Sequence, residues 1–109
     1  MRKLDLERYP THHQKDDGTP VLFDVRSSAI EVLFVDGRLT AVERLKREEL
    51  ARRIENEPTE TLLVENADWD RLNEGMAMAT MPGREFNEFV RRIVEAPTVQ
   101  VEERLRSVS

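Results

Sequence analysis

An Asp-Gly pair at positions 36 and 37 constrains the fold of this chain more than any other feature, because apolar residues lie on both sides of it. Asp-Gly between two apolar runs is typical of the tight turn of a β-hairpin, and the alternation of Ile30, Val32 and Phe34 before it fits a strand. The same stretch also places apolar side chains on one broad face of a helix. The fold class depends on which of these two structures forms.

The residues after the glycine favour two helices over a hairpin. Thr40 and Glu43 have the spacing of a capping box, in which the hydroxyl accepts a backbone amide of the first turn and the glutamate reaches back. A helix that begins there leaves a second strand too short to hold a hairpin. We therefore expect helices over residues 24–35 and 41–55, with Gly37 in the left-handed conformation that ends the first one.

Two further helices are predicted from apolar periodicity in the second half of the chain. Residues 66–80, capped by Asn66, carry a narrow apolar seam, and residues 84–95 carry a complete stripe at i, i+3, i+4, i+7 and i+8. Gly75 lies inside the first of these helices, where it costs about 1 kcal/mol relative to alanine. It therefore indicates a close crossing with a neighbouring element. The apolar residues 62–64 between the helices are expected to be extended.

The apolar faces of these helices define the predicted core. Asp24 is expected to cap the first helix. Glu43 and Arg47 are four residues apart and interrupt the apolar face of the second helix, so we expect an ion pair between them at the edge of the core. The residues predicted to form the core are Leu33, Leu50, Ile54, Trp69, Leu72, Met76, Phe86, Phe89 and Ile93.

Both ends of the chain are expected to be extended arms, because neither offers enough apolar surface to offset the entropy of its own ordering. The predicted organisation is an N-terminal arm (residues 1–20), a helical domain (21–97) and a C-terminal arm (98–109). The predicted fold class is mainly α, a compact four-helix domain with extended arms. The alternative is an α+β fold with a hairpin at residues 22–39, joined by residues 59–64.

The sequence contains no recognisable catalytic, cofactor or metal motif. Absence of cysteine removes thiolate catalysis and cysteine-ligated metals. His12 and His13, with Asp16 and Asp17, are the candidate metal cluster, but adjacent histidines point apart on most backbones. We therefore expect no metal, no cofactor and no enzymatic activity.

Charge and hydropathy restrict the partners. The net charge of −5 argues against nucleic-acid binding, which depends on neutralising phosphates. The arginine pairs at 52–53 and at 91–92 are the candidate basic patch, although glutamates lie near each pair. No run approaches the roughly 20 apolar residues of a membrane-spanning helix, so no membrane association is expected.

One segment resembles a family of small phage-encoded proteins of unsettled role, which share a Leu-Thr/Ser-x-x-Glu…Arg-x-x-Leu-Ala-x-x-Ile helix. The resemblance continues through "TLLVENADWDRL" and "FVRRIVEAP". It implies a phage protein that works by protein contact in the host cytoplasm or the virion. The matching residues are Leu39, Thr40, Glu43, Arg47, Leu50, Ala51 and Ile54.

The sequence therefore predicts a non-enzymatic phage virion or assembly protein: a head or tail component or a morphogenesis chaperone. Its expected partners are other phage proteins or further copies of itself in a homo-oligomer. The alternative is a small phage regulator that binds a host or phage protein or a nucleic acid. The residues expected to contact a partner are Tyr9, His12, His13, Arg91, Arg92, Val99 and Val101.

Overall fold

The computed structural model describes residues 1–81 and 83–100. Over these residues the chain forms four helices and two small antiparallel sheets, so the fold is α+β and the expected mainly α class is wrong. In chain order the elements are β1 (Arg2–Asp5), β2 (Tyr9–Gln14), β3 (Pro20–Phe23), α1 (Val25–Leu33), α2 (Ala41–Asn56), β4 (Thr61–Val64), α3 (Asn66–Met78) and α4 (Phe86–Val94).

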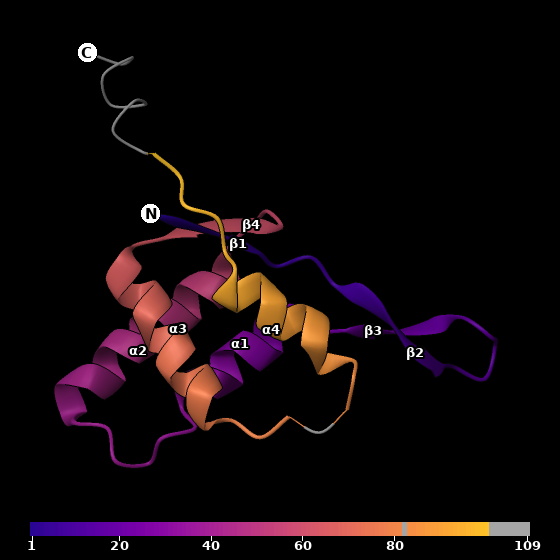
Figure 1. Ribbon diagram of the computed structural model, residues 1–109, viewed down its shortest axis with the longest axis horizontal. Coiled ribbons are helices and arrows are strands. Elements are labelled where there is room, and N and C mark those ends of the chain that lie inside the picture. Colours follow the sequence, from indigo (N-terminus) through magenta and orange to yellow (C-terminus); the bar gives the residue numbers. More distant parts are fainter. Residues whose placement is uncertain (82, 101–109) are drawn as a thin grey trace.

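The first sheet joins the N-terminus to the middle of the chain. β1 pairs antiparallel with β4, with Leu4 opposite Leu62, and Figure 1 shows the two strands side by side above the helices. Leu4 and Leu6 are buried, because alternation in a strand places both on the face that packs on the core. The expected extended arm is therefore wrong for residues 1–6, which pack on the core, whereas the extended structure expected at residues 62–64 is confirmed.

The second sheet is the β2–β3 hairpin, which lies earlier in the chain than the hairpin of the alternative prediction. Residues 22–39 form no hairpin, since most of them belong to α1 and to the connection after it. The tight turn between β2 and β3 instead uses Gly18, whose φ of +85° is a left-handed conformation that suits glycine. The backbone N–H of Lys15 donates to the carbonyl of Thr19 at 2.8 Å and closes the turn.

The four helices lie within a few residues of their predicted ranges, and two of the predicted caps are confirmed. The Asp24 carboxylate accepts the backbone N–H of Ser27 at 3.1 Å, and the Thr40 hydroxyl accepts that of Glu43 at 3.2 Å. The reciprocal half of the capping box does not form, since the Glu43 carboxylate binds arginine side chains instead.

Two details of the helix ends were predicted wrongly. Within the described residues the glycines with positive φ are Gly18 and Gly83, so Gly37 is not in the left-handed conformation. The turn after α1 is instead held by Asp36, whose carboxylate accepts the backbone N–H of Arg38 at 2.9 Å. The cap of α3 is Glu65 and not Asn66.

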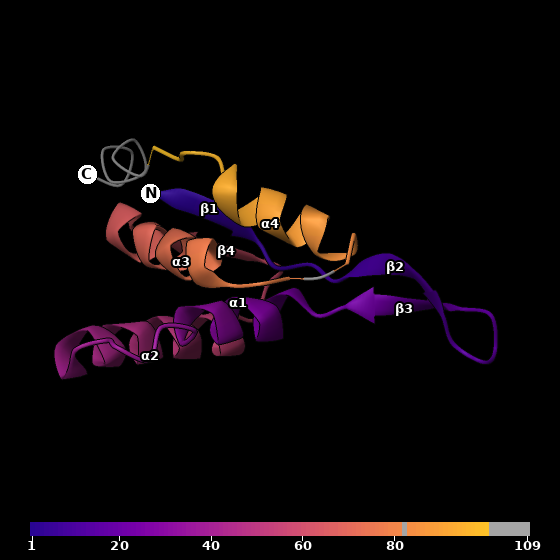
Figure 2. The same ribbon diagram turned by 60° about the horizontal axis from the view of Figure 1, so that its bottom comes forward.

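The helices pack in two layers. α1 packs on α2 and on α3, and α4 packs on α3 and on β1, as the side view in Figure 2 shows. Gly75 lies where α3 crosses α1: a Cβ atom there would lie 2.0 Å from the carbonyl oxygen of Val32. The predicted close crossing at Gly75 is therefore present, and its partner is α1.

The core lies between the two helical layers and β1. Trp69, Met76 and Phe86 are only partly buried and pack against its edge. The indole N–H of Trp69 donates to the carbonyl of Ile93 at 2.7 Å, and the guanidinium of Arg2 lies 4.0 Å from its ring centroid, so Trp69 ties α3 to α4 and to β1. The other predicted core residues are buried: Leu33, Leu50, Ile54, Leu72, Phe89 and Ile93.

Candidate functional site

The β2–β3 hairpin stands off the helical body, and we call residues 9–23 the arm. Figures 1 and 2 both show it extending away from the helices on the side of α4. Phe23 at its base is buried, whereas Val21 and Leu22 on β3 are 37% and 48% exposed. The arm is therefore fixed at one end and exposes two apolar side chains to solvent next to its base.

Aromatic side chains anchor the base of the arm. Tyr9 stacks on Phe23 with ring centroids 4.9 Å apart, and Phe86 meets Phe23 edge-on at 5.2 Å. The Tyr9 hydroxyl donates to the carbonyl of Glu85 and accepts the backbone N–H of Phe89 at 3.1 Å. Burial raises the pKa of Tyr9, so its hydroxyl stays protonated as a donor. Tyr9, expected to contact a partner, thus joins the arm to α4.

The register of the arm is irregular between Pro10 and Gln14. Pro10 pairs with Leu22 and Gln14 with Pro20, so β2 contains extra residues opposite β3. His12 and His13 lie within this irregular stretch, and their imidazoles are close together, with ring centroids 4.1 Å apart.

The carboxylate of Glu85, in the turn before α4, faces this histidine pair. His13 Nε2 lies 3.7 Å from Glu85 Oε1. The sequence does not predict that Glu85 lies near the two histidines, because this contact depends on how the arm docks on α4. Of the sequence-predicted residues, His12 and His13 are therefore brought together with a third ionisable group.

The predicted basic residues are all engaged by nearby carboxylates. Arg52 pairs with Glu48 at 3.2 Å and Arg53 with Asp68 at 3.6 Å. Pairing leaves little uncompensated positive charge at residues 52–53 for a phosphate backbone.

Arg91 and Arg92 on α4 behave in the same way. Arg91 lies 3.8 Å from both Glu88 and Glu95, and its side chain is 68% exposed. Arg92 is 15% exposed and pairs with Glu88 at 3.1 Å and with Asp5 at 3.5 Å. Arg92 therefore links α4 to the end of β1, while Arg91 remains on the surface.

The predicted contact residues of the C-terminal arm fall in two groups. Val99 pairs with the N-terminus of its own chain, since its backbone N–H donates to the carbonyl of Met1 at 2.7 Å. Val101 lies outside the described residues. The segment before it runs beside β1 on the edge opposite β4, where Thr98 forms a bridge with Arg2.

A charged network joins α2 to α1 and α3. Arg47 is only 2% exposed, and its guanidinium donates to the carbonyl of Leu33 at 2.9 Å. It also contacts Glu43 at 3.2 Å and Glu74 at 2.9 Å. The expected Glu43–Arg47 pair at the core edge is therefore present, and its partner Glu74 was missed because the contact requires the α2–α3 packing.

Arg71 completes this network from α3. It lies 2.8 Å from Glu43 and 2.7 Å from Asp68. Burial acts to raise the pKa of Glu43, but the hydrogen bonds from Arg71 and Arg47 outweigh it and hold that pKa below its usual range. The arrangement neutralises each charge and joins three helices, so its role is structural.

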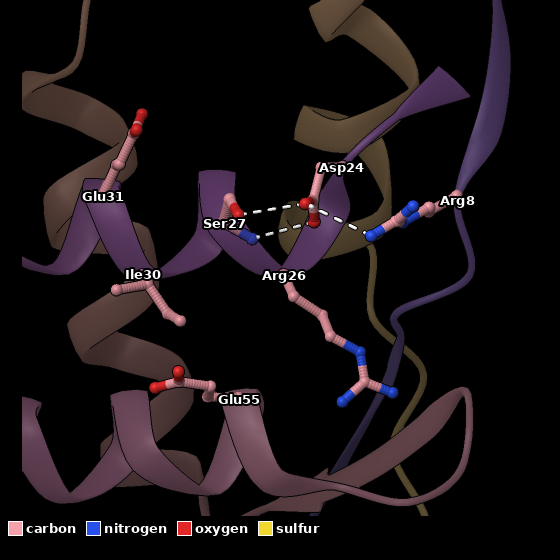
Figure 3. A pocket seen from close by; sticks show the side chains of 7 residues that line it. All are labelled: Arg8, Asp24, Arg26, Ser27, Ile30, Glu31 and Glu55. Atoms are coloured by element: carbon pink, nitrogen blue, oxygen red, sulfur yellow. Dashed lines mark hydrogen bonds and ion pairs between the residues drawn. The ribbon is translucent and has the colours of Figure 1, made fainter. Parts of the chain in front are cut away.

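An open depression of about 450 Å³ lies between the start of α1 and the end of α2. Figure 3 shows Asp24 at its upper edge, bound to Ser27 and facing Arg8 at 3.6 Å. The hydrogen bond from the backbone N–H of Ser27 lowers the pKa of Asp24, so this carboxylate is held ionised as a helix cap. The residues that line the depression are Arg8, Asp24, Arg26, Ser27, Ile30, Glu31 and Glu55.

Arg26, which lines this depression, also stabilises the fold by binding backbone carbonyls. The Arg26 guanidinium donates to the carbonyls of Ile54 at 2.9 Å, Glu57 at 2.6 Å and Thr59 at 2.6 Å. These bonds satisfy carbonyls at the end of α2, which have no partner within the helix. Two of the residues that line the depression, Asp24 and Arg26, therefore cap helices.

The chain matches no protein-family model, and no curated protein or solved structure is similar to it at a level that indicates a relationship. Among the helices of the described residues, none has the length and apolar content needed to cross a membrane.

Proposed function

We propose that this chain is a non-enzymatic protein that works through protein–protein contacts made by the arm, in the assembly or the structure of a phage particle. The observation that carries the proposal is the arm itself, a hairpin that extends from the helical body and exposes Val21 and Leu22. The resemblance of residues 39–54 to small phage-encoded proteins supports the phage setting.

The arm is suited to binding a partner because contacts within the chain already order it at its base and at its tip. Its base is fixed by the stacking of Tyr9 on Phe23, and its tip by hydrogen bonds from Thr19 to the Asp17 carboxylate at 2.6 and 3.0 Å. A preorganised segment loses less conformational entropy on binding than a disordered one.

The edges of the hairpin supply a specific mode of contact. In the described part of the chain, β2 and β3 form a sheet of two strands, so each is an edge strand. An edge strand binds a further extended segment through main-chain hydrogen bonds, and neighbouring side chains provide specificity. Val21 and Leu22 lie on β3 and would be covered by such a partner strand.

The surroundings of the arm support a binding role over a catalytic one. In the open depression Asp24 and Arg26 cap helices, and the groups of the charged network neutralise one another. The alternative of a nucleic-acid-binding regulator is less well supported, because Arg52, Arg53 and Arg92 are paired with carboxylates.

Light scattering coupled to size-exclusion chromatography tests the proposal, with a second copy of this chain as the first partner to examine. A double substitution on the arm, Val21→Asp with Leu22→Asp, is compared with Val42→Asp and Leu45→Asp on α2. The α2 pair is a matched control, since those side chains are also exposed, at 65% and 59%.

We expect the wild-type mass to rise above that of the monomer as the concentration increases. The arm variant should remain monomeric, and the α2 variant should behave as the wild type does. Association that is lost in the α2 variant and retained in the arm variant would place the contact on α2 instead. A wild type that stays monomeric and also fails to bind purified phage structural proteins would contradict the proposed function.

A further inference from the structure

We propose that His12, His13 and Glu85 form a binding site for a divalent transition-metal ion, represented by Zn²⁺, between the arm and the turn before α4. This proposal is independent of the proposed function. Two imidazoles and a carboxylate are ligands that zinc binds in proteins, and His12, His13 and Glu85 place one ligand atom each within 4.8 Å of the others.

The irregular register of the arm is what brings the two histidines together. In a regular strand, successive side chains point to opposite faces, so adjacent histidines would not share a ligand. Here the pairing with β3 is irregular at Thr11: its hydroxyl donates to the carbonyl of Val21 at 2.7 Å and accepts the backbone N–H of His13 at 3.3 Å. The imidazoles of His12 and His13 consequently lie 4.1 Å apart, with their planes inclined by 36°.

Glu85 is held toward the same point by the backbone around it. Its carbonyl accepts the hydroxyl of Tyr9, which fixes the turn before α4 against the arm. Gly83, two residues earlier, has a φ of +114° and leaves room for the carboxylate: a Cβ atom at Gly83 would lie 2.7 Å from Glu85 Oε2. The Glu85 side chain is only 21% exposed, so the carboxylate is directed inward at the base of the arm.

To match a metal site, the three ligand atoms, which now lie within 4.8 Å of one another, must move closer together. Zn–N and Zn–O bonds of about 2.0–2.2 Å place tetrahedral ligand atoms about 3.3 Å apart. The separation of 3.7 Å between His13 Nε2 and Glu85 Oε1 is close to that value. Both histidines are exposed, so rotation of their side chains meets little resistance.

The ligand set also selects the kind of ion. Imidazole suits Zn²⁺, Ni²⁺ and Cu²⁺, whereas Mg²⁺ and Ca²⁺ prefer sites made of oxygen ligands. Three protein ligands leave at least one coordination position for water. An ion bound there would join the arm to the turn before α4 and so hold the base of the arm more rigidly.

Isothermal titration calorimetry of the full chain without an affinity tag, using zinc chloride, tests this site. The ligand variants are His12→Ala, His13→Ala and Glu85→Gln. The matched control is Asp16→Asn, which removes an exposed carboxylate of the same hairpin. Circular dichroism establishes that each variant keeps the secondary structure of the wild type.

We expect one Zn²⁺ per chain, with Kd raised at least about tenfold by each ligand substitution and unchanged in the control. Equal Kd values for the wild type and Glu85→Gln would overturn the three-ligand site and leave a surface pair of histidines. A loss in Asp16→Asn as large as that in the ligand variants would place the ion at the tip of the arm and overturn the proposal. Absence of saturable binding to the wild type would overturn it as well.

Discussion

The two small sheets of this protein have the same number of strands and opposite relations to the core. β1 and β4 pair in register, and Leu4 and Val64 on their inner face are completely buried. β2 and β3 pair with an irregular register and bury only Phe23, at their base. The β1–β4 sheet therefore contributes to the stability of the body, while the β2–β3 hairpin is attached to the body only at its base.

This difference follows from the side chains that each strand carries. Leu4 and Leu6 alternate with charged residues, so one face of the N-terminal strand is apolar and packs on the core. Between Pro10 and Gln14 there is no apolar residue, so nothing requires β2 to lie on the core. Burial stabilises the first sheet, and exposure leaves the second available for contact.

Matched leucine substitutions in the two sheets should show the largest difference in stability. Leu4→Ala removes a fully buried side chain and should lower the free energy of unfolding by about 2–5 kcal/mol. Leu22→Ala changes a side chain that is 48% exposed and should cost no more than about 0.5 kcal/mol. Urea denaturation of both variants measures the difference, and equal losses would show that the arm is part of the stabilising core.

Matched glycine substitutions compare the loss of stability at a close-packed and at an open position of the chain. Gly75→Ala places a Cβ atom 2.0 Å from the Val32 carbonyl oxygen, so α1 and α3 must move apart, at a cost of about 1–3 kcal/mol. Gly37→Ala meets no atom within 4 Å and should change stability by less than about 0.5 kcal/mol. Thermal unfolding followed by circular dichroism distinguishes them, and a wild-type melting temperature for Gly75→Ala would refute the close crossing.

A smaller loss of stability is expected at low pH. It can be compared for one carboxylate of the body, Glu43, and one of the arm, Asp17. The folded-state pKa values of Glu43 and Asp17 both lie below their usual ranges. A lowered folded pKa means that the unfolded chain takes up the proton first, so stability is complete above about pH 4.5 and falls as the pH decreases further. Glu43→Gln should flatten this decline, since Glu43 holds two arginines together.

Asp17→Asn provides the comparison for the acid experiment. Asp17 is exposed and is held by hydrogen bonds from the exposed Thr19, so its replacement should leave the acid decline almost unchanged. Chemical denaturation at a series of pH values measures both variants. A flatter decline in Asp17→Asn than in Glu43→Gln would transfer the acid sensitivity from the body to the arm.

The helices could be predicted from the sequence because their signals are local. The caps Asp24 and Thr40 and the stripe of residues 84–95 depend on neighbours within a few positions, and the helices form close to where those signals place them. The extended structure of β4 was visible in the same way, as a short apolar run ending in Val64.

The strands near the N-terminus could not be predicted with the same rules. β1 is short and its partner β4 lies far along the chain, so its stability depends on a pairing that no local pattern reveals. The alternation of Leu4 and Leu6 was the available signal, and the polar residues after it obscured that signal. Glu85 near the histidine pair and Glu74 near Arg47 belong to the same class, because only tertiary packing brings them close.

Hydrogen exchange followed by NMR at low and at high protein concentration tests most directly whether the arm is a contact element supported by a stable body. The backbone amides of Leu4 in β1 and Leu72 in α3, both fully buried, should exchange slowly at both concentrations, because their exposure requires global unfolding. The amides of β3 should exchange rapidly in dilute solution and become protected as the concentration rises. Protection of β3 that is as strong in dilute solution as that of Leu4, or concentration-dependent protection confined to α2, would contradict the division between arm and body.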